Sequence, residues 1–165
     1  MVKESAGSIN FKRPESILVV IYTVDGQSLL LKRVRPVFWQ SVTGSLECHN
    51  ETPEDAARRE VYEETGIQAT TGWIDWHITR CFPIHLQYRE KYSPGTTINH
   101  EHMFSLQLDE PYPVYLNSDE HTASEWCSLI SAREKVGGWT NRLAIDQVIE
   151  LNKGNSKTHY ISRIN

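Results

Sequence analysis

The chain has 165 residues, of which 39% are hydrophobic and 23% are charged, and its formal net charge at pH 7 is -4. This length fits one domain, and the composition is that of a globular protein that can bury an apolar core without disulfides. The negative charge argues against sequence-independent binding of nucleic acid polymers, which needs a basic surface, and the longest apolar run, residues 17–22, is too short to cross a membrane.

The first part of the chain predicts a hairpin and one further strand. Residues 1–10 are polar, and we expect a flexible N-terminus there. An Ile- and Val-rich run predicts a buried strand, and Asp25-Gly26 then gives the turn signal of a hairpin. The predicted strands are residues 16–24, 28–33 and 39–43.

A helix follows, and both of its ends carry signals in the sequence. Thr52 is the expected N-cap, and Pro53 fits the first helical position, where its missing N–H costs nothing. Gly66 fits the C-terminal stop. We therefore predict a helix between these residues.

The second part of the chain adds strands, a long connection and two helices. The strands are predicted at residues 72–80, 98–108 and 123–128, and the helices at residues 129–136 and 139–151. The connection at residues 81–97 is of a length that is usually functional or mobile. We expect a single α/β domain over residues 11–151, with a mixed sheet between helices, and a polar tail over residues 152–165.

The cysteines indicate the compartment. Cys48, Cys81 and Cys127 are widely spaced and form no CxxC pair, which argues against a zinc site or a disulfide framework. Residues 1–10 also lack the apolar stretch of a secretory signal. We therefore expect the protein in the cytoplasm.

The predicted helix carries a cluster of acids. Glu60, Glu63 and Glu64 stand at i, i+3 and i+4, so they share one helix edge beside the apolar stripe of Ala57 and Val61. Like charges placed this closely repel each other, and a divalent cation with oxygen ligands would offset the repulsion. A solvated acidic face is the simpler alternative that this spacing alone leaves open.

Residues 44–67 resemble the Nudix box, the family pattern G-x5-E-x7-R-E-U-x-E-E-x-G-U, in which U is bulky and apolar. The matching residues are Glu51, Arg59, Glu60, Val61, Glu63, Glu64, Gly66 and Ile67. Gly44 lies seven positions before Glu51 rather than six, so the loop has one additional residue. The resemblance implies a Nudix-type α/β/α sandwich in which the box forms a catalytic loop–helix–loop.

The resemblance also implies roles for the acids. It implies Mg²⁺ as cofactor, with Mn²⁺ as an alternative, bound by Glu60 and Glu64, with Glu63 as a further ligand or the base. Family members often recruit another acid from a loop before a late strand. Glu120 is our candidate for this ligand, and Asp119 and Glu125 are its rivals.

Segments outside the box resemble one branch of the family, which hydrolyses 7,8-dihydroneopterin triphosphate to the monophosphate and pyrophosphate in folate synthesis. The resembling segments include residues 12–14, 38–45, 92–95 and 139–142. The resemblance implies a small-molecule triphosphate as substrate.

Residues outside the box are candidates for contacts with this substrate. Lys12 and Arg33 can meet the triphosphate, although each is also an ordinary solvated cation. Phe82 and His85 can form a wall for a flat bicyclic ring, unless Phe82 only fills the core. The other candidates are Thr43, His121 and Gly138.

Two other functions stay open at this stage. The first is hydrolysis of dATP or an oxidised nucleotide by the same chemistry. The second is a non-catalytic Nudix-like binding module, although such a module would be expected to lose acids of the box. We expect a monomer without a membrane or nucleic acid partner.

Overall fold

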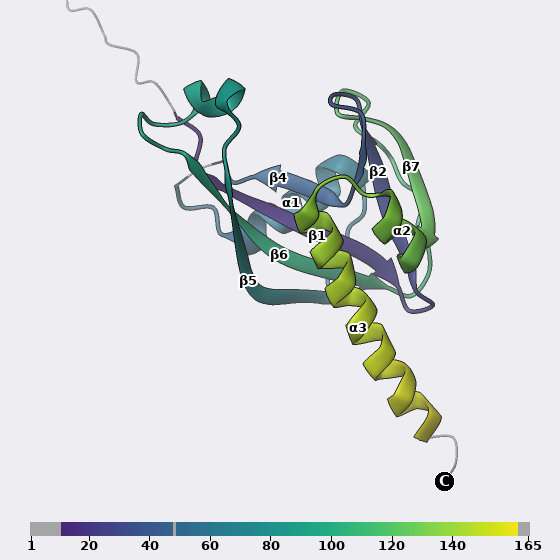
Figure 1. Ribbon diagram of the computed structural model, residues 1–165. Coiled ribbons are helices and arrows are strands. Elements are labelled where there is room, and N and C mark those ends of the chain that lie inside the picture. Colours follow the sequence, from purple (N-terminus) through teal and green to yellow (C-terminus); the bar gives the residue numbers. More distant parts are fainter. Residues whose placement is uncertain (1–10, 48, 162–165) are drawn as a thin grey trace, which may run out of the picture.

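The computed structural model describes residues 11–47 and 49–161, and it shows one mixed sheet covered by helices (Figure 1). The strands are β1 (Glu15–Thr23), β2 (Gln27–Arg33), β3 (Trp39–Gln40), β4 (Val42–Ser45), β5 (Trp73–Pro83), β6 (Ile98–Leu108) and β7 (His121–Ser128). The helices are α1 (Pro53–Thr65), α2 (Leu129–Lys135), α3 (Trp139–Ile161) and the 3₁₀ helix η1 (Leu86–Lys91).

The seven-stranded sheet has the order β3-β2-β1-β6-β5, with β4 paired to β1 and β7 paired to β2. β1 and β6 run parallel, and the other pairings of the described strands are antiparallel. β4 pairs with the first half of β1, and β2 pairs with its second half. The prediction of a mixed sheet is confirmed.

Apolar side chains cover both faces of the sheet. Odd-numbered residues of β1, such as Ile17 and Val19, pack with Ala57 and Val61 of α1. Even-numbered residues, such as Leu18, pack with residues of α2 and α3. α2 and α3 lie in front of the sheet in Figure 1. The predicted α/β/α sandwich is therefore confirmed.

Helix α1 begins and ends as its sequence predicts. The hydroxyl oxygen of Thr52 accepts a hydrogen bond from the backbone N–H of Asp55 at 3.1 Å, and Pro53 is the first helical residue. Gly66 ends the helix with φ +72°, a conformation that a residue with a side chain rarely adopts. These local signals fix the helix that carries the acids.

Three parts of the chain differ from the prediction. β5 continues to Pro83, and the 3₁₀ helix η1 lies within the connection predicted at residues 81–97. The strand predicted at residues 39–43 is divided into β3 and β4, because the backbone N–H of Ser41 donates to Oδ1 of Asn141 at 2.8 Å rather than to a strand. Helix α3 continues to Ile161, whereas the sequence predicts a polar tail from residue 152. The predictions for residues 1–10 and 162–165 lie outside the described residues. None of the helices in the described part of the chain has the length and apolar character needed to cross a bilayer.

Candidate functional site

One end of the sheet gathers the residues predicted for the site. Ser16, near the start of β1, pairs with Ser45 at the end of β4 and with Glu101 near the start of β6. Arg33, at the end of β2, pairs with His121 at the start of β7. The loop after β4 leads into α1, so the acidic helix edge belongs to this end of the molecule.

Arg59 organises the acids on the α1 edge. Its guanidinium makes a forked pair with Glu51, from Nε to Oε1 at 2.8 Å and from Nη2 to Oε2 at 3.2 Å. Its Nη1 donates to Glu60 at 2.8 Å and to Glu63 at 3.0 Å, and its Nη2 donates to the carbonyl oxygen of Ser45 at 3.0 Å. The guanidinium therefore ties the helix to the loop that follows β4.

Glu51 keeps its place in this network despite the additional residue in the loop. Its Oε2 accepts the backbone N–H of Glu47 at 2.6 Å, besides the bonds from Arg59. The hydrogen bonds from Arg59 are the largest cause that lowers the pKa of Glu51. Glu51 is therefore a charged anchor of the loop.

Glu60 sits deeper than a solvated acid would. Its side chain is 12% exposed, and burial raises its pKa to about 7, with further contributions from Glu64 and Glu63 against the lowering effect of Arg59. A Cβ atom on Gly44 would lie 1.8 Å from Cδ of Glu60. Only glycine at position 44 therefore leaves room for this carboxylate.

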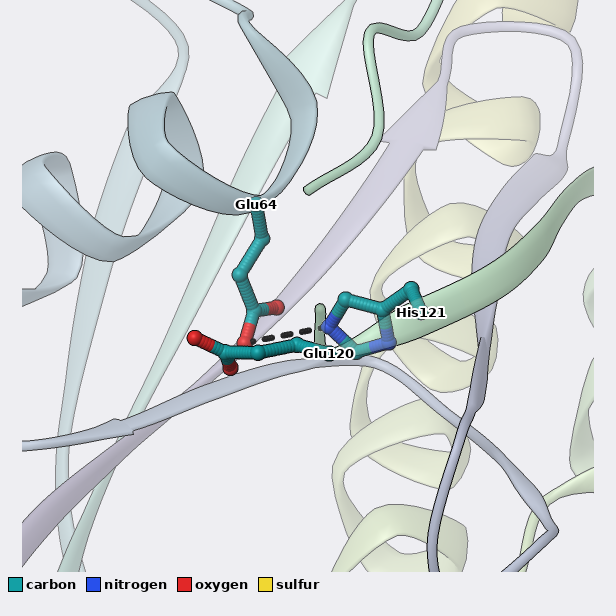
Figure 2. A group of neighbouring side chains, drawn as sticks. All are labelled: Glu64, Glu120 and His121. Carbon is teal, nitrogen blue, oxygen red and sulfur yellow. Dashed lines mark ion pairs between the residues drawn. The ribbon is translucent and has the colours of Figure 1, made fainter. Parts of the chain in front are cut away.

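Glu64 is the most buried acid of the helix and faces the start of β7. Figure 2 shows its side chain projecting from α1 toward His121, with the carboxylate of Glu120 beside it. One ligand atom from each of these residues lies within 4.8 Å of those from the other two. Oε1 of Glu64 is 3.3 Å from Nε2 of His121, and the two side chains are 3% and 1% exposed.

This group contains polar atoms that the protein itself leaves unpaired. Oε2 of Glu64 and both ring nitrogens of His121 are buried and have no hydrogen-bond partner among the described residues, since the contact between the two side chains has the distance of an ion pair without hydrogen-bond geometry. Burial raises the pKa of Glu64, and the neighbouring charge of Glu120 adds to this effect. Unpaired buried groups of this kind are costly unless a ligand or ion engages them.

The donors of this group suit a divalent cation. Two carboxylates and an imidazole offer oxygen and nitrogen ligands of the kinds that Mg²⁺ and Mn²⁺ accept, with oxygen preferred by Mg²⁺. The site is half closed, because Glu64 and His121 are buried while Glu120 is exposed. A cation there would satisfy the buried oxygen of Glu64 and still face solvent on the side of Glu120.

The remaining predicted acids lie in different surroundings. Glu63 is 48% exposed and pairs with Arg59, outside the group around Glu64. Glu125, a rival of Glu120, pairs with Lys135 at 2.5 Å. Asp119 is exposed, and its backbone N–H donates to the side chain of Asn117. Of the rival acids, the structure brings Glu120 to Glu64.

The cations and Thr43 lie around the same end of the sheet. Nζ of Lys12 is 3.4 Å from the hydroxyl oxygen of Ser45, and the Lys12 side chain is exposed. The guanidinium of Arg33 lies 5.8 Å from the ring centroid of Phe38. Thr43 accepts a hydrogen bond from Gln40, and its backbone N–H lowers the pKa of Glu64.

The residues predicted for the ring of the substrate are spread more widely. Phe82 is half-buried near the end of β5, whereas His85 is exposed just before η1. Gly138 precedes α3 with φ +79°, and nothing lies within 4 Å of the position that a Cβ atom would take there. His121 is buried behind Glu64, so the structure places it beside the acids rather than on an open surface. Its predicted contact with substrate stays a prediction.

Glu101, a buried acid of β6, is not among the residues predicted from the sequence. It is 5% exposed, and its Oε2 has no hydrogen-bond partner among the described residues. In β6 the odd-numbered residues from Asn99 to Ser105 face the same side and are all buried. This alternation is a signal in the sequence, but an acid at an inward position is read more readily as a break in the pattern than as part of a site.

Comparisons with known proteins show which family this chain resembles and which proteins are similar to it. A family profile described as NUDIX domain matches residues 12–147. The chain is 42% identical over 144 residues to dihydroneopterin triphosphate diphosphatase of Escherichia coli (strain K12), covering 84% of this chain and 94% of that protein. It is 34% identical over 146 residues to the Haemophilus influenzae protein of the same name, covering 86% of this chain and 90% of that protein. The solved structure of the E. coli dihydroneopterin triphosphate pyrophosphohydrolase is 43% identical, with a TM-score of 0.73, covering 83% of this chain and 95% of that one.

Proposed function

The chain belongs to the Nudix hydrolase family, and from this premise we propose that it hydrolyses 7,8-dihydroneopterin triphosphate to dihydroneopterin monophosphate and pyrophosphate. The proposed substrate rests on the 42% identity to the E. coli enzyme, because this identity extends over 94% of that enzyme's length and is not limited to the Nudix box. The H. influenzae relative of the same name supports it.

We propose Mg²⁺ as the cofactor, with Mn²⁺ as an alternative, held by Glu64 and Glu120 with Glu60 next to them. The buried, unpaired oxygen of Glu64 and the nearby carboxylate of Glu120 support this assignment. When bound, such an ion polarises phosphoryl oxygens and neutralises charge on the leaving pyrophosphate. Glu63 and His121 keep their predicted roles as a further ligand or base and as a substrate contact.

The protein's own groups bind and orient the substrate. Lys12 lies beside Ser45 at the end of β4, where its ammonium can meet the triphosphate, and Arg33 is the second candidate cation. Glu63 is half exposed and shares the Arg59 guanidinium with Glu60, which suits a base that passes the proton of the attacking water to solvent. Arg59 holds Glu60 and Glu63 in place and is not itself expected to touch substrate.

The test compares substrates in the presence of Mg²⁺. Purified protein is mixed with dihydroneopterin triphosphate, dATP or 8-oxo-dGTP, and the phosphate products are identified by ³¹P NMR. We expect pyrophosphate, with kcat/KM for the pterin at least about tenfold above that for either nucleotide. Equal efficiencies would remove the pterin assignment, and absence of turnover with all three would indicate a binding module.

We also propose that the enzyme acts as a cytoplasmic monomer on this small molecule. Sedimentation of the purified protein tests the monomer, and fractionation of the producing cell tests the compartment. A dimer at micromolar concentration would contradict the proposed monomer.

A further inference from the structure

Glu101 of β6 is a buried acid that the proposed metal site does not use. Its side chain faces α3, and burial raises its pKa against the lowering effect of a hydrogen bond from Thr140 at the start of α3. Its second oxygen, Oε2, is buried without a partner among the described residues. The protein therefore provides Glu101 with one hydrogen bond, from Thr140, and provides none for Oε2.

Arg80 of β5 stands directly beside Glu101, and the two are Cα partners across β5 and β6. Partners in an antiparallel pair point to the same face of the sheet. Even so, no ion pair within the described part of the chain joins them, and Nε of Arg80 is likewise buried without a partner. An acceptor and a donor thus lie side by side on one face, each with an unused hydrogen-bonding atom.

This pair lies within reach of the phosphate end of the site. Ser16 separates Glu101 from Ser45 in the sheet, so the two backbones are two strand spacings apart, about 10 Å. Ser45 is the residue that contacts Lys12. Phe82, two residues beyond Arg80 on β5, points to the same face as that arginine. Ring and phosphate sites separated in this way fit a bicyclic ring with a side chain that bears a triphosphate.

We propose that Glu101 and Arg80 recognise the 2-amino-4-oxo edge of the substrate ring. The Glu101 carboxylate accepts the ring N3–H and the 2-amino group, and the Arg80 guanidinium donates to the 4-oxo oxygen. This inference rests on the proposed hydrolysis of a pterin triphosphate and names the groups that select it. Guanine presents the same edge, whereas adenine places a hydrogen-bond acceptor where the carboxylate needs a donor.

The physical reason for selection is the cost of an unpaired buried acid. A ring with both N–H donors restores the hydrogen bonds that the carboxylate lost on burial. A ring without them leaves Oε2 of the carboxylate dehydrated and without a partner, which makes rejection stronger than the loss of one favourable contact.

The test uses a pair of substrates that differ only at this edge. GTP and ITP share every group except the 2-amino group, which ITP lacks. In the wild-type protein with Mg²⁺ we expect kcat/KM for GTP to exceed that for ITP by about 10- to 100-fold, because ITP cannot make the hydrogen bond from a 2-amino group to the buried carboxylate. Glu101→Gln should bring this ratio close to one, and it should raise KM for dihydroneopterin triphosphate.

Glu134→Gln, which changes an exposed acid of α2, is the matched control and should leave the ratio unchanged. Thermal unfolding of Glu101→Gln checks that it is folded, and the wild-type ratio stands without any variant. Equal efficiencies for GTP and ITP in the wild type, or an unchanged ratio in folded Glu101→Gln, would overturn the recognition by Glu101. Neither result would affect the proposed hydrolysis itself, which fails only if no triphosphate is cleaved.

Discussion

The two groups of charged side chains on α1 are built in opposite ways. Around Arg59, hydrogen bonds of 2.8 to 3.2 Å join the guanidinium to Glu51, Glu60 and Glu63. Around Glu64, one turn further along the helix, the buried oxygen Oε2 and the ring nitrogens of His121 have no hydrogen-bond partner among the described residues. The first group is satisfied by the protein, whereas the second is not.

This difference separates support from function. The hydrogen bonds of the Arg59 network satisfy its charged groups and join the loop to the helix, so Arg59 and Glu51 serve to position the other acids. A buried charged group without partners is costly, and the proposed cation would engage the acids around Glu64.

The largest effect is expected from Glu64→Gln. The change keeps the shape of the side chain and removes the charge that a cation needs, so turnover with Mg²⁺ should fall at least about 100-fold. Pyrophosphate release under saturating substrate measures it. The matched control is Glu54→Gln, an exposed acid in the first turn of the same helix, which should retain full activity. Equal activity of the two variants would show that Glu64 holds no metal.

A smaller loss of activity, together with a loss of stability, is expected from Arg59→Ala. The substitution removes the guanidinium partner of two largely buried carboxylates, Glu51 and Glu60, while the backbone N–H of Glu47 still donates to Glu51. The free energy of unfolding should therefore fall by about 2 to 4 kcal/mol and kcat by about 10- to 100-fold. Chemical denaturation and steady-state kinetics measure the two quantities.

The neighbouring Arg58 provides the control for this variant. Its ion pair with Glu54 is long, at 3.5 Å, and exposed, so Arg58→Ala should cost less than about 1 kcal/mol. If both arginine variants lose the same stability and activity, then the Arg59 network has no special supporting role.

Gly44→Ala should reduce activity about tenfold by moving one carboxylate. The added Cβ would lie 2.0 Å from Oε1 of Glu60, so this carboxylate has to turn away from Arg59. A double-mutant cycle with Glu60→Ala isolates the effect, because the side chain that causes the collision is then absent. An unchanged effect of Gly44→Ala in the Glu60→Ala background would mean that the glycine is needed for another reason.

The last effect expected concerns stability and not turnover, and it is a pH dependence in the metal-free protein. Because burial raises the pKa of Glu60 from 4.5 to about 7, the folded state binds a proton more tightly than the unfolded state. The stability that Glu60 gains from this proton is fully present below the pKa of 4.5 that the group has in the unfolded state. It is lost as the pH rises through about 7. Between these values the free energy of unfolding should fall by roughly 1 to 3 kcal/mol.

Glu60→Gln isolates this contribution, since an amide does not titrate. The difference in free energy of unfolding between wild type and Glu60→Gln, measured by urea denaturation without metal, should change across this pH range. A difference that is constant between pH 4.5 and pH 7 would contradict the assigned burial of Glu60.

Local signals made α1 predictable. Thr52, Pro53 and Gly66 act on residues next to them, and the helix begins and ends where they predict. The shared edge of the acids follows from helix periodicity. Their depth does not follow, because Glu64 is buried and Glu63 is half exposed according to what packs opposite each of them.

Long-range pairings were not predictable from these signals. Glu120 became a candidate metal ligand only through the family resemblance, since no local pattern shows that the start of β7 lies beside Glu64. Glu101 was missed, because its burial depends on α3 closing over the sheet. The extension of α3 to Ile161 was also missed, because a polar sequence without proline permits both a helix and a loose tail.

Crystals soaked in Mn²⁺ would show which acids hold the metal, since anomalous scattering locates the ion without assumptions about its ligands. We expect a peak about 2.0 to 2.3 Å from carboxylate oxygens of both Glu64 and Glu120. A peak held by exposed acids while Glu64 still faces His121 alone, or no peak at saturating Mn²⁺, would contradict it.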